Sequence, residues 1–318
     1  MRALQHFLED VREKNLMVLY AQVRQGGDVI DYWSRLGQRK SDGLTSYSGL
    51  TRLESYSTAK TFSGFGIGLA LDAGLIRLDE KVADSFPEYT YNITNPYALN
   101  VTVQDMLMMS TGLEETMFFR DSPERAREKD WGRYFYQTGK FVRPSGTQFK
   151  YCNINTYMLG RLVARKSGER NLLEYMRYRL FEPLGIGNPD MTTCPMGHTV
   201  GANGMAINVD EMGRFGEMIL RGGEYKGKRI LSEAFVKDAT AKHLVSDQLQ
   251  YTDDKDGLFD YGYHIWVDSV HKCCALTGIL GQFCVIAPEK DAVITVMSLE
   301  EDERLVGKLL WEDILAEL

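Results

Sequence analysis

Residues 55–74 read SYSTAKTFSGFGIGLALDAG. The first part of this stretch contains an S-x-x-K motif formed by Ser57 and Lys60. The residues that follow, up to Leu71, are small and apolar, and Gly74 is a suitable helix end. We therefore expect a buried helix with Ser57 at its N-terminus and Lys60 about one turn later on the same face.

A serine in this position has the surroundings that a nucleophile needs. The free backbone N–H groups and the positive end of the helix favour negative charge that develops on a substrate oxygen. A lysine in a partly dry site loses its proton more easily and can serve as the base for the hydroxyl. The alternative is that Ser57 only caps the helix and Lys60 is solvated, because so short a motif also occurs by chance. Ser269 and Lys272 form a second match, but they lie between two expected strands with no apolar helix after them.

A second polar pair, Tyr151 and Asn153, lies in the stretch PSGTQFKYCN at residues 144–153. This stretch begins with a turn and leads into a helix that we expect from Asn155 to Gly168. A phenol near a lysine cation can have a lowered pKa and can shuttle protons. An asparagine amide can donate to a substrate carbonyl and accept from the lysine. The alternative is a buried tyrosine followed by a turn-forming asparagine.

Strand patterns lie at both ends of the chain. The N-terminal part predicts a helix, Leu4–Glu13, and a hairpin of two strands, Leu16–Val23 and Val29–Trp33. The C-terminal part predicts four strands and a final helix: Tyr261–Val267, Cys273–Leu276, Phe283–Ile286, Ala292–Ser298 and Glu301–Leu318. We expect an α+β fold in which residues 1–56 and 225–318 form one antiparallel sheet with the two terminal helices on one face. Residues 57–224 are expected to form a mostly helical region, with the active site in the cleft between the two.

The composition is that of a globular protein. The chain has 318 residues, of which 44% are hydrophobic and 25% charged, and these values exclude a disordered chain. A net charge of −7 argues against nucleic-acid binding, and no apolar run reaches the length of a membrane span. Five cysteines without a C-x-x-C spacing favour neither a disulfide framework nor a zinc site. Acidic residues near the N-terminus do not fit a signal peptide, so we expect a cytoplasmic protein. We also expect that it binds no metal and no organic cofactor.

Taken together, the two motifs resemble those of serine β-lactamases and penicillin-binding proteins. The similarity extends in the right order along most of the chain, through residues 74–82, 102–113, 144–160 and 222–231. The pattern is most similar to the branch that contains class C β-lactamases, family VIII carboxylesterases, D-amino-acid peptidases and nylon-oligomer hydrolases. The resemblance implies the β-lactamase/transpeptidase-like fold.

The resemblance also implies roles for the motif residues. Ser57 would be the nucleophile, Lys60 its base partner and Tyr151 the proton shuttle, while Asn153 would orient Lys60 and the substrate. Whether Lys60 or Tyr151 is the working base stays open, because the two titrations would be coupled.

The third motif of the family falls on residues 275–282, which read ALTGILGQ. Thr277 and Gly278 match the family, and the backbone N–H of Ile279 would be the second oxyanion donor beside that of Ser57. Leu276 stands where the family has a cation. This cation helps to bind the substrate carboxylate in the family, and the loss of a charged hydrogen bond typically costs about 1.5–3 kcal/mol.

The missing cation predicts weak β-lactamase activity and favours a neutral or amine-bearing ester or amide as the substrate. Three residues are candidates for a replacement cation: His264, His271 and Lys272. Lys272 lies on the same face of the strand as Leu276, but about 13 Å away, which is too far for a direct replacement.

The sequence therefore predicts a serine hydrolase that acts through an acyl-enzyme on a small ester or amide. One alternative is a catalytically weak binding or sensor protein that kept the fold, and Leu276 favours it. Another is a true β-lactamase or D-Ala-D-Ala peptidase. The sequence does not fix the oligomeric state.

Overall fold

The computed structural model describes residues 3–35, 51–119, 121–249 and 258–318. Its α-helices are α1 Gln5–Glu13, α2 Ala59–Asp72, α3 Pro87–Thr90, α4 Pro96–Leu99, α5 Val103–Leu107, α6 Pro123–Arg127, α7 Trp131–Thr138, α8 Asn153–Ser167, α9 Leu172–Met176, α10 Val209–Leu220, α11 Glu233–Ala239 and α12 Glu303–Leu309. Its strands are β1 Val18–Gln25, β2 Asp28–Ser34, β3 Leu53–Glu54, β4 Asp190–Met191, β5 Met205–Ile207, β6 Glu224–Tyr225, β7 Lys228–Arg229, β8 Leu244–Leu249, β9 Leu258–Tyr261, β10 Trp266–Asp268, β11 Cys273–Gly278, β12 Gln282–Ala287 and β13 Ala292–Ser298.

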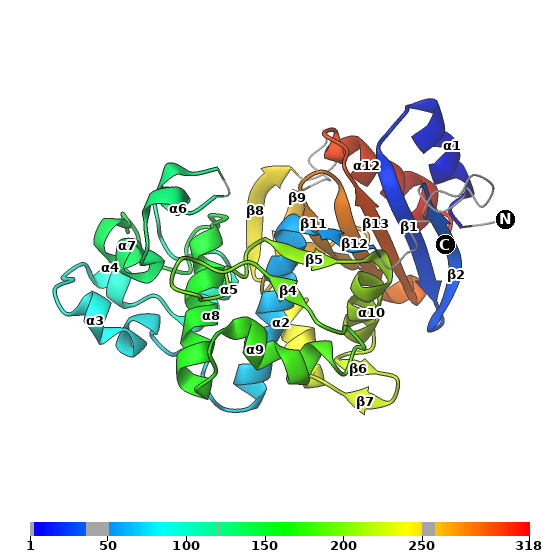
Figure 1. Ribbon diagram of the computed structural model, residues 1–318. Helices are drawn as coiled ribbons and strands as arrows, with labels where there is room; N and C mark the ends of the chain where they lie inside the picture. Colours follow the sequence, from blue (N-terminus) through cyan, green and yellow to red (C-terminus); the bar gives the residue numbers. More distant parts are fainter. Residues whose placement is uncertain (1–2, 36–50, 120, 250–257) are drawn as a thin grey trace.

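The main sheet joins the two ends of the chain, as the strand patterns predict. Its eight strands have the order β2-β1-β13-β12-β11-β10-β9-β8, and neighbouring strands are antiparallel. The N-terminal hairpin pairs with the last strand, so that Val23 lies opposite Ile294. Figure 1 shows the blue N-terminal strands beside the orange C-terminal strands.

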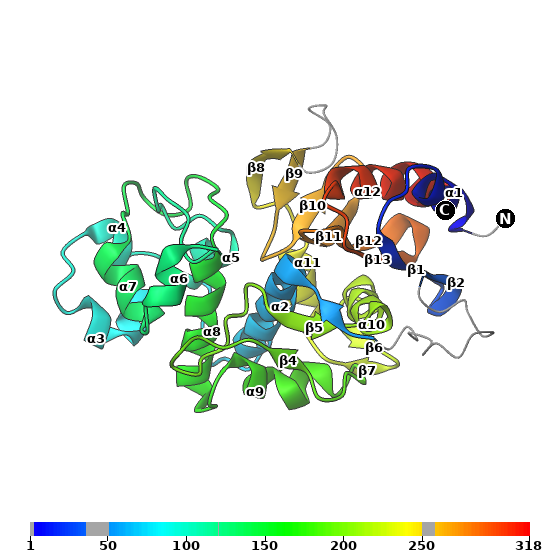
Figure 2. The ribbon, with the colours of Figure 1, turned by 45° about the horizontal axis from the view of Figure 1, so that its top comes forward.

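The two terminal helices cover one face of this sheet. Phe7 of α1 and Val306 of α12 are buried in the same cluster as Val285 and Ile294 of the sheet. Figure 2 shows α1 and α12 together on one side of the strands and α10 on the other. The amphipathic pattern of the N-terminal segment therefore has its apolar stripe against the sheet, as expected.

The opposite face of the sheet packs against α10, which approaches closely because it carries small residues. A Cβ atom on Gly216 would lie 2.7 Å from the Cys284 sulfur and 2.7 Å from a Val293 methyl, so only glycine fits. Helix α2 lies in the same core, between the sheet and the helical region (Figure 1). From Ala59 to Ala70 every residue of α2 is buried, which agrees with its small, apolar sequence.

Several element boundaries differ from the sequence expectations, most of them by one or two residues. The segment Tyr261–Val267 is not one strand: it is the end of β9, a turn, and the start of β10. The Gly262 N–H donates to the Ile265 carbonyl at 2.9 Å and closes this turn. Helix α8 begins at Asn153, two residues earlier than expected, and the final helix begins at Glu303 and continues as a π-helical segment, Leu310–Leu315. Among the described residues, no helix has both the length and the apolar composition that crossing a membrane requires.

Candidate active site

Ser57 lies in a short 3-10 turn, Tyr56–Thr58, directly before α2. Tyr56 has a φ of +49°, a conformation that a residue with a side chain adopts only when its surroundings hold it. The turn is held from both sides: the Ser55 N–H donates to the Met205 carbonyl at 2.9 Å, and the Thr58 hydroxyl donates to the Ser55 carbonyl at 3.0 Å. The Ser57 side chain is thereby fixed at the start of the helix, and it is partly exposed.

Lys60 lies one turn further along and is only 1% exposed. Its Nζ donates to the Ser57 Oγ at 3.1 Å and to the Ala202 carbonyl at 2.9 Å. The pKa of Lys60 is lowered from 10.5 to about 7, and burial is the main cause; Cys152 opposes this shift, and the nearby Arg125 charge adds to it. At neutral pH a large fraction of Lys60 is therefore uncharged and can accept a proton.

The ring of Tyr151 lies beside the Ser57–Lys60 pair. The Lys60 Nζ lies 4.6 Å from the centre of this ring, and the ring stacks on Trp266 with their centres 5.7 Å apart. Burial raises the pKa of Tyr151 well above its usual value, while a side-chain hydrogen bond with Ser57 opposes the shift. Tyr151 is therefore protonated at neutral pH, contrary to the expectation that the neighbouring lysine lowers its pKa.

The segment before Tyr151 is tied to the end of α5, which sets the position of the tyrosine. The Lys150 N–H donates to the Met109 carbonyl at 2.7 Å, and the Gly146 N–H donates to the Ser110 carbonyl at 2.8 Å. These contacts connect two segments that resemble family landmarks. They attach the stretch that carries Tyr151 to the segment after α5, and the Tyr151 ring meets Lys60 of α2 although the two residues are about ninety positions apart in the sequence.

Asn153 is the first residue of α8 and is buried. Its Nδ2 donates to the Phe118 carbonyl at 3.0 Å, and its Oδ1 has no hydrogen-bond partner among the described residues. The described hydrogen bonds of the Lys60 amine go to Ser57 and Ala202. The orienting role expected for Asn153 therefore stays a prediction, with Oδ1 as the atom available for it.

Strand β11 ends against the turn Tyr56–Thr58, which carries the candidate nucleophile Ser57 and is called the nucleophile turn below. A Cβ atom on Gly278 would lie 2.6 Å from the Ser55 carbonyl oxygen and 3.2 Å from the Ser57 nitrogen, so the strand backbone passes close to Ser57. Thr277 is buried, whereas the next residue after the strand, Ile279, is 50% exposed. The predicted substrate-binding residues Thr277, Gly278 and Ile279 are thus on the strand that flanks Ser57.

Leu276 is fully buried in the core that includes α2 and α10, opposite Cys284 of β12. The three candidate replacement cations have other partners. His264 is buried between the Thr156 hydroxyl and the Leu107 carbonyl, each at 2.9 Å, and burial lowers its pKa to about 3. His271 bonds to Asp268 at 2.7 Å, and Lys272 pairs with Glu289 at 2.7 Å at the far end of β11. His264 is therefore neutral at pH 7 and does not replace the cation.

Two backbone carbonyls belong to the site although the sequence did not single them out. The Ala202 carbonyl accepts from Lys60, and the Phe118 carbonyl accepts from Asn153. Ala202 lies in a stretch between Gly201 and Gly204, both with positive φ, and Phe118 has a φ of +60°. The glycine pair at 201 and 204 is the only feature of the sequence that could have drawn attention to the first of these segments.

The described part of the chain contains no group of three or more histidine, cysteine or carboxylate side chains arranged to hold a metal ion. All five cysteines are buried and form no disulfide, and burial raises the pKa of Cys152, the one next to Tyr151, to about 11.

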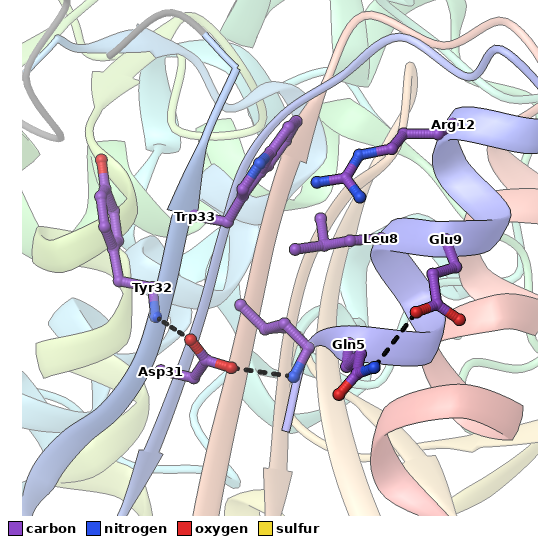
Figure 3. Close-up of a pocket in the computed structure, with 8 residues that line it drawn as sticks. Gln5, Leu8, Glu9, Arg12, Asp31, Tyr32 and Trp33 are labelled. Atoms are coloured by element: carbon purple, nitrogen blue, oxygen red, sulfur yellow. Dashed lines mark hydrogen bonds between the residues drawn. The ribbon is translucent and has the colours of Figure 1, made fainter. Parts of the chain in front are cut away.

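A cavity of about 180 Å³ lies away from Ser57, between α1 and the edge strand β2. Figure 3 shows Asp31 on its wall, accepting from the Tyr32 N–H group. Asp31 also accepts from the Leu4 N–H at 3.0 Å, and none of the candidate site residues lines this cavity.

A family model described as Beta-lactamase matches residues 4–315. The chain belongs to the beta-lactamase family. This assignment confirms the resemblance carried by the Ser57–Lys60 and Tyr151–Asn153 motifs. Among curated proteins, this beta-lactamase family member is 23% identical over 254 residues to a 6-aminohexanoate-dimer hydrolase of Paenarthrobacter ureafaciens. The match covers 76% of this chain and 64% of that protein, so the chain spans less than two thirds of the relative's length.

Two solved structures show the same fold. A penicillin-binding protein homologue from Caulobacter crescentus has a TM-score of 0.76 at 18% identity, with 100% of this chain and 97% of that chain covered. A family VIII carboxylesterase has a TM-score of 0.75 at 16% identity, also with 100% and 97% covered. The β-lactamase/transpeptidase-like fold, with its antiparallel sheet and terminal helices, is therefore confirmed.

Proposed function

We propose that the protein is a serine hydrolase that acts through an acyl-enzyme. The observation that carries this proposal is the pair formed by Lys60 and Ser57, with 3.1 Å between the Nζ and the Oγ atoms and the amine almost fully buried. A buried amine with a pKa of about 7 has the basicity that a general base needs at neutral pH. No solvated surface lysine would have this property.

In the proposed first half-reaction, neutral Lys60 takes the proton of the Ser57 hydroxyl while Oγ attacks the substrate carbonyl carbon. The negative charge moves to the carbonyl oxygen, which the backbone N–H groups of Ser57 and Ile279 stabilise. Tyr151 is protonated and lies beside Ser57, so it can give its proton to the leaving alkoxide or amine as the bond to the carbonyl carbon breaks. The family resemblance leaves open whether Lys60 or Tyr151 is the base. The pKa of Lys60 is lowered and that of Tyr151 is raised, and both directions favour Lys60 as the base.

Before the second half-reaction, the Lys60 ammonium returns a proton to the Tyr151 phenolate, so that Lys60 is neutral again. Water then attacks the acyl-enzyme and gives its proton to Lys60, which passes it to the Ser57 Oγ as the acyl bond breaks. The acid is released and the Ser57 hydroxyl forms again. Each half-reaction uses the same oxyanion donors. The overall reaction consumes one water molecule and needs no metal ion or organic cofactor.

The proposed substrate is a small neutral or amine-bearing ester or amide. Leu276 is buried and apolar, and therefore it cannot bind a substrate carboxylate at the position where the family has a cation. Two proteins that resemble this chain are named a 6-aminohexanoate-dimer hydrolase and a family VIII carboxylesterase, which supports hydrolysis of an ester or amide. We therefore propose that β-lactamase activity is weak.

The experiment compares turnover of p-nitrophenyl acetate and nitrocefin by the wild-type protein, Ser57→Ala and Ser269→Ala. Ser269 begins the second S-x-x-K match, but it lies in the turn after β10 and donates to Asp260 at 2.6 Å, which makes it a matched control. The proposal expects ester turnover that Ser57→Ala loses and Ser269→Ala keeps, with little nitrocefin hydrolysis. Rapid nitrocefin hydrolysis would contradict the proposed weak β-lactamase activity and would indicate a true β-lactamase.

The second candidate is a catalytically weak binding or sensor protein. Leu276 favours it, because a family position that carries charge is here part of the core. The buried Lys60 amine disfavours it. Burying this amine costs free energy, and a protein that only binds a ligand has no need of a buried base. No turnover and no covalent adduct with either compound would favour this second function.

A further inference from the structure

The turn between β11 and β12, residues 279–281, carries the backbone N–H that the proposed function assigns to the oxyanion. Leu280 at its centre has a φ of +63°, and Gly281 has a φ of +78°. A leucine in the left-handed region costs free energy, so contacts from outside the turn are needed to keep it there. The turn is also only half covered, since Ile279 is 50% exposed.

The contacts that hold the turn come from the first residue of β12, from the end of β13 and the segment after it, and from the start of α12. The Leu280 N–H donates to the Oε2 of Glu303 at 2.7 Å. The Leu280 carbonyl accepts from the Ser298 hydroxyl, from the Gln282 side chain at 3.2 Å and from the Glu300 N–H at 3.2 Å. Both backbone groups of Leu280 are thus satisfied, and Glu303 supplies the charged partner.

The other side of Ile279 is also fixed. Gly278 lies against the nucleophile turn, so closely that a Cβ atom would clash with the Ser55 carbonyl. Ile279 is therefore held between two anchors, the contact of Gly278 with residues 55–57 and the hydrogen bond of Leu280 with Glu303. Loss of either anchor would let the Ile279 N–H rotate away from the Ser57 N–H.

We propose that Glu303 is a positioning residue for the oxyanion site, because its carboxylate fixes the peptide that follows the Ile279 N–H. This inference rests on the proposed function, since it gives Glu303 a part in the same site without contact with the substrate. A helix-start role alone does not explain the contact. Asp302 already caps α12 by accepting from the Leu305 N–H at 3.1 Å, and a solvated glutamate would interact with the helix dipole equally well.

The test compares Glu303→Ala, which removes the acceptor, with Glu303→Gln, whose amide oxygen keeps it. The matched control is Glu289→Ala, because Glu289 is an exposed carboxylate near the other end of β11, paired with Lys272. Deleting an oxyanion donor typically lowers kcat by about 10²–10³. Misplacing one should cost less, so we expect Glu303→Ala to lower kcat for p-nitrophenyl acetate about tenfold, with KM changed by less than about threefold.

Affinity for an aryl boronic acid, which forms a tetrahedral adduct on an active-site serine, should fall in Glu303→Ala by the same factor as kcat/KM. Glu303→Gln and Glu289→Ala should stay within about threefold of wild type in kcat and in boronic acid affinity. Unchanged kcat and boronic acid affinity in Glu303→Ala would overturn the proposal. An equal loss in Glu303→Gln would also overturn it, because the acceptor would then not be the cause.

Hydrogen exchange gives a second readout that does not need activity. Peptides covering residues 278–282 should exchange faster in Glu303→Ala than in wild type, at unchanged melting temperature, and those in Glu289→Ala should not. Unchanged exchange in this segment would overturn the proposed anchor. A wild-type protein without ester turnover would overturn the proposed function instead, and this outcome is distinct because the wild type is measured first.

Discussion

The contact of Gly278 with the nucleophile turn gives the sharpest quantitative prediction. In Gly278→Ala the new Cβ would lie 2.6 Å from the Ser55 carbonyl oxygen, about 0.4 Å inside the 3.0 Å that real Cβ contacts keep. It would also lie 3.2 Å from the Ser57 nitrogen. Both neighbours are backbone atoms, and no flexible side chain can move aside. The end of β11 must therefore shift away from Ser57.

The expected magnitudes follow from this shift. Overpacking typically destabilises a protein by about 1–3 kcal/mol, so the variant should still fold. The shift also separates the Ile279 N–H from the Ser57 N–H, and a misplacement of about 1 Å near the reacting atoms can cost about 10² in rate. We therefore predict that Gly278→Ala lowers kcat for p-nitrophenyl acetate by about 10- to 100-fold with a smaller change in KM.

The assay is steady-state ester hydrolysis together with urea unfolding. The control is Gly187→Ala, because a Cβ atom on Gly187 meets nothing within 4 Å and this glycine has an ordinary φ. The control should keep wild-type kcat and change stability by less than about 0.5 kcal/mol. A Gly278→Ala protein with wild-type kcat and unchanged stability would refute the argument that β11 is pressed against the nucleophile turn.

Four further predictions concern Lys60, Tyr151 and Leu276. Only the neutral amine of Lys60 accepts a proton, so kcat/KM for a neutral ester should rise about tenfold per pH unit up to about pH 7 and then level off; a flat profile from pH 5 to 8 would exclude Lys60 as the base. The pKa of Lys60 is about 7 in the folded protein and 10.5 in the unfolded chain, so between these two pH values the unfolded chain binds more protons. The free energy of unfolding of the wild type, compared with that of Lys60→Met, should therefore rise with pH from about 7 to 10.5. Tyr151→Phe should lower kcat by about 10² or more, and the loss should be larger for alkyl esters than for p-nitrophenyl esters, because a poor leaving group needs the proton; equal losses for both would contradict the role of Tyr151 as the acid. Leu276→Lys should destabilise the protein by about 3 kcal/mol or more in urea and gain no nitrocefin turnover, whereas Leu276→Met should cost less than about 1.5 kcal/mol; a gain in nitrocefin hydrolysis would show that position 276 faces the substrate.

Local sequence patterns predicted most of the fold. The amphipathic stripe of residues 4–13, the N-terminal hairpin and the apolar strands near the C-terminus are each predicted from a local pattern. The prediction of a single strand over Tyr261–Val267 is wrong, because the turn in this segment depends on a contact with a residue far away in the sequence. His264 has a φ of +56° there, and its N–H donates to the Leu107 carbonyl at 3.0 Å, which no local pattern indicates. Strand β8, Leu244–Leu249, was not predicted at all.

The candidate site shows the same division between local and long-range information. The spacing of Ser57 and Lys60 places both side chains on one helix face, and the structure brings Tyr151 to them. The partners that adjust their chemistry come from elsewhere in the sequence. The Ala202 carbonyl that holds the lysine amine and the Trp266 ring that stacks on the tyrosine are tertiary contacts. The raised pKa of Tyr151 could not be predicted either, because it depends on burial more than on the neighbouring lysine.

The central claim is that Ser57 becomes acylated. Intact-mass measurement after rapid mixing with p-nitrophenyl acetate at pH 7.5, followed by acid quench and peptide mapping, tests it directly. We expect one acetyl group of about 42 Da on the peptide that contains Ser57, present in wild type and Ser269→Ala and absent in Ser57→Ala. An acetyl group that persists in Ser57→Ala, or one mapped to another residue, would contradict it.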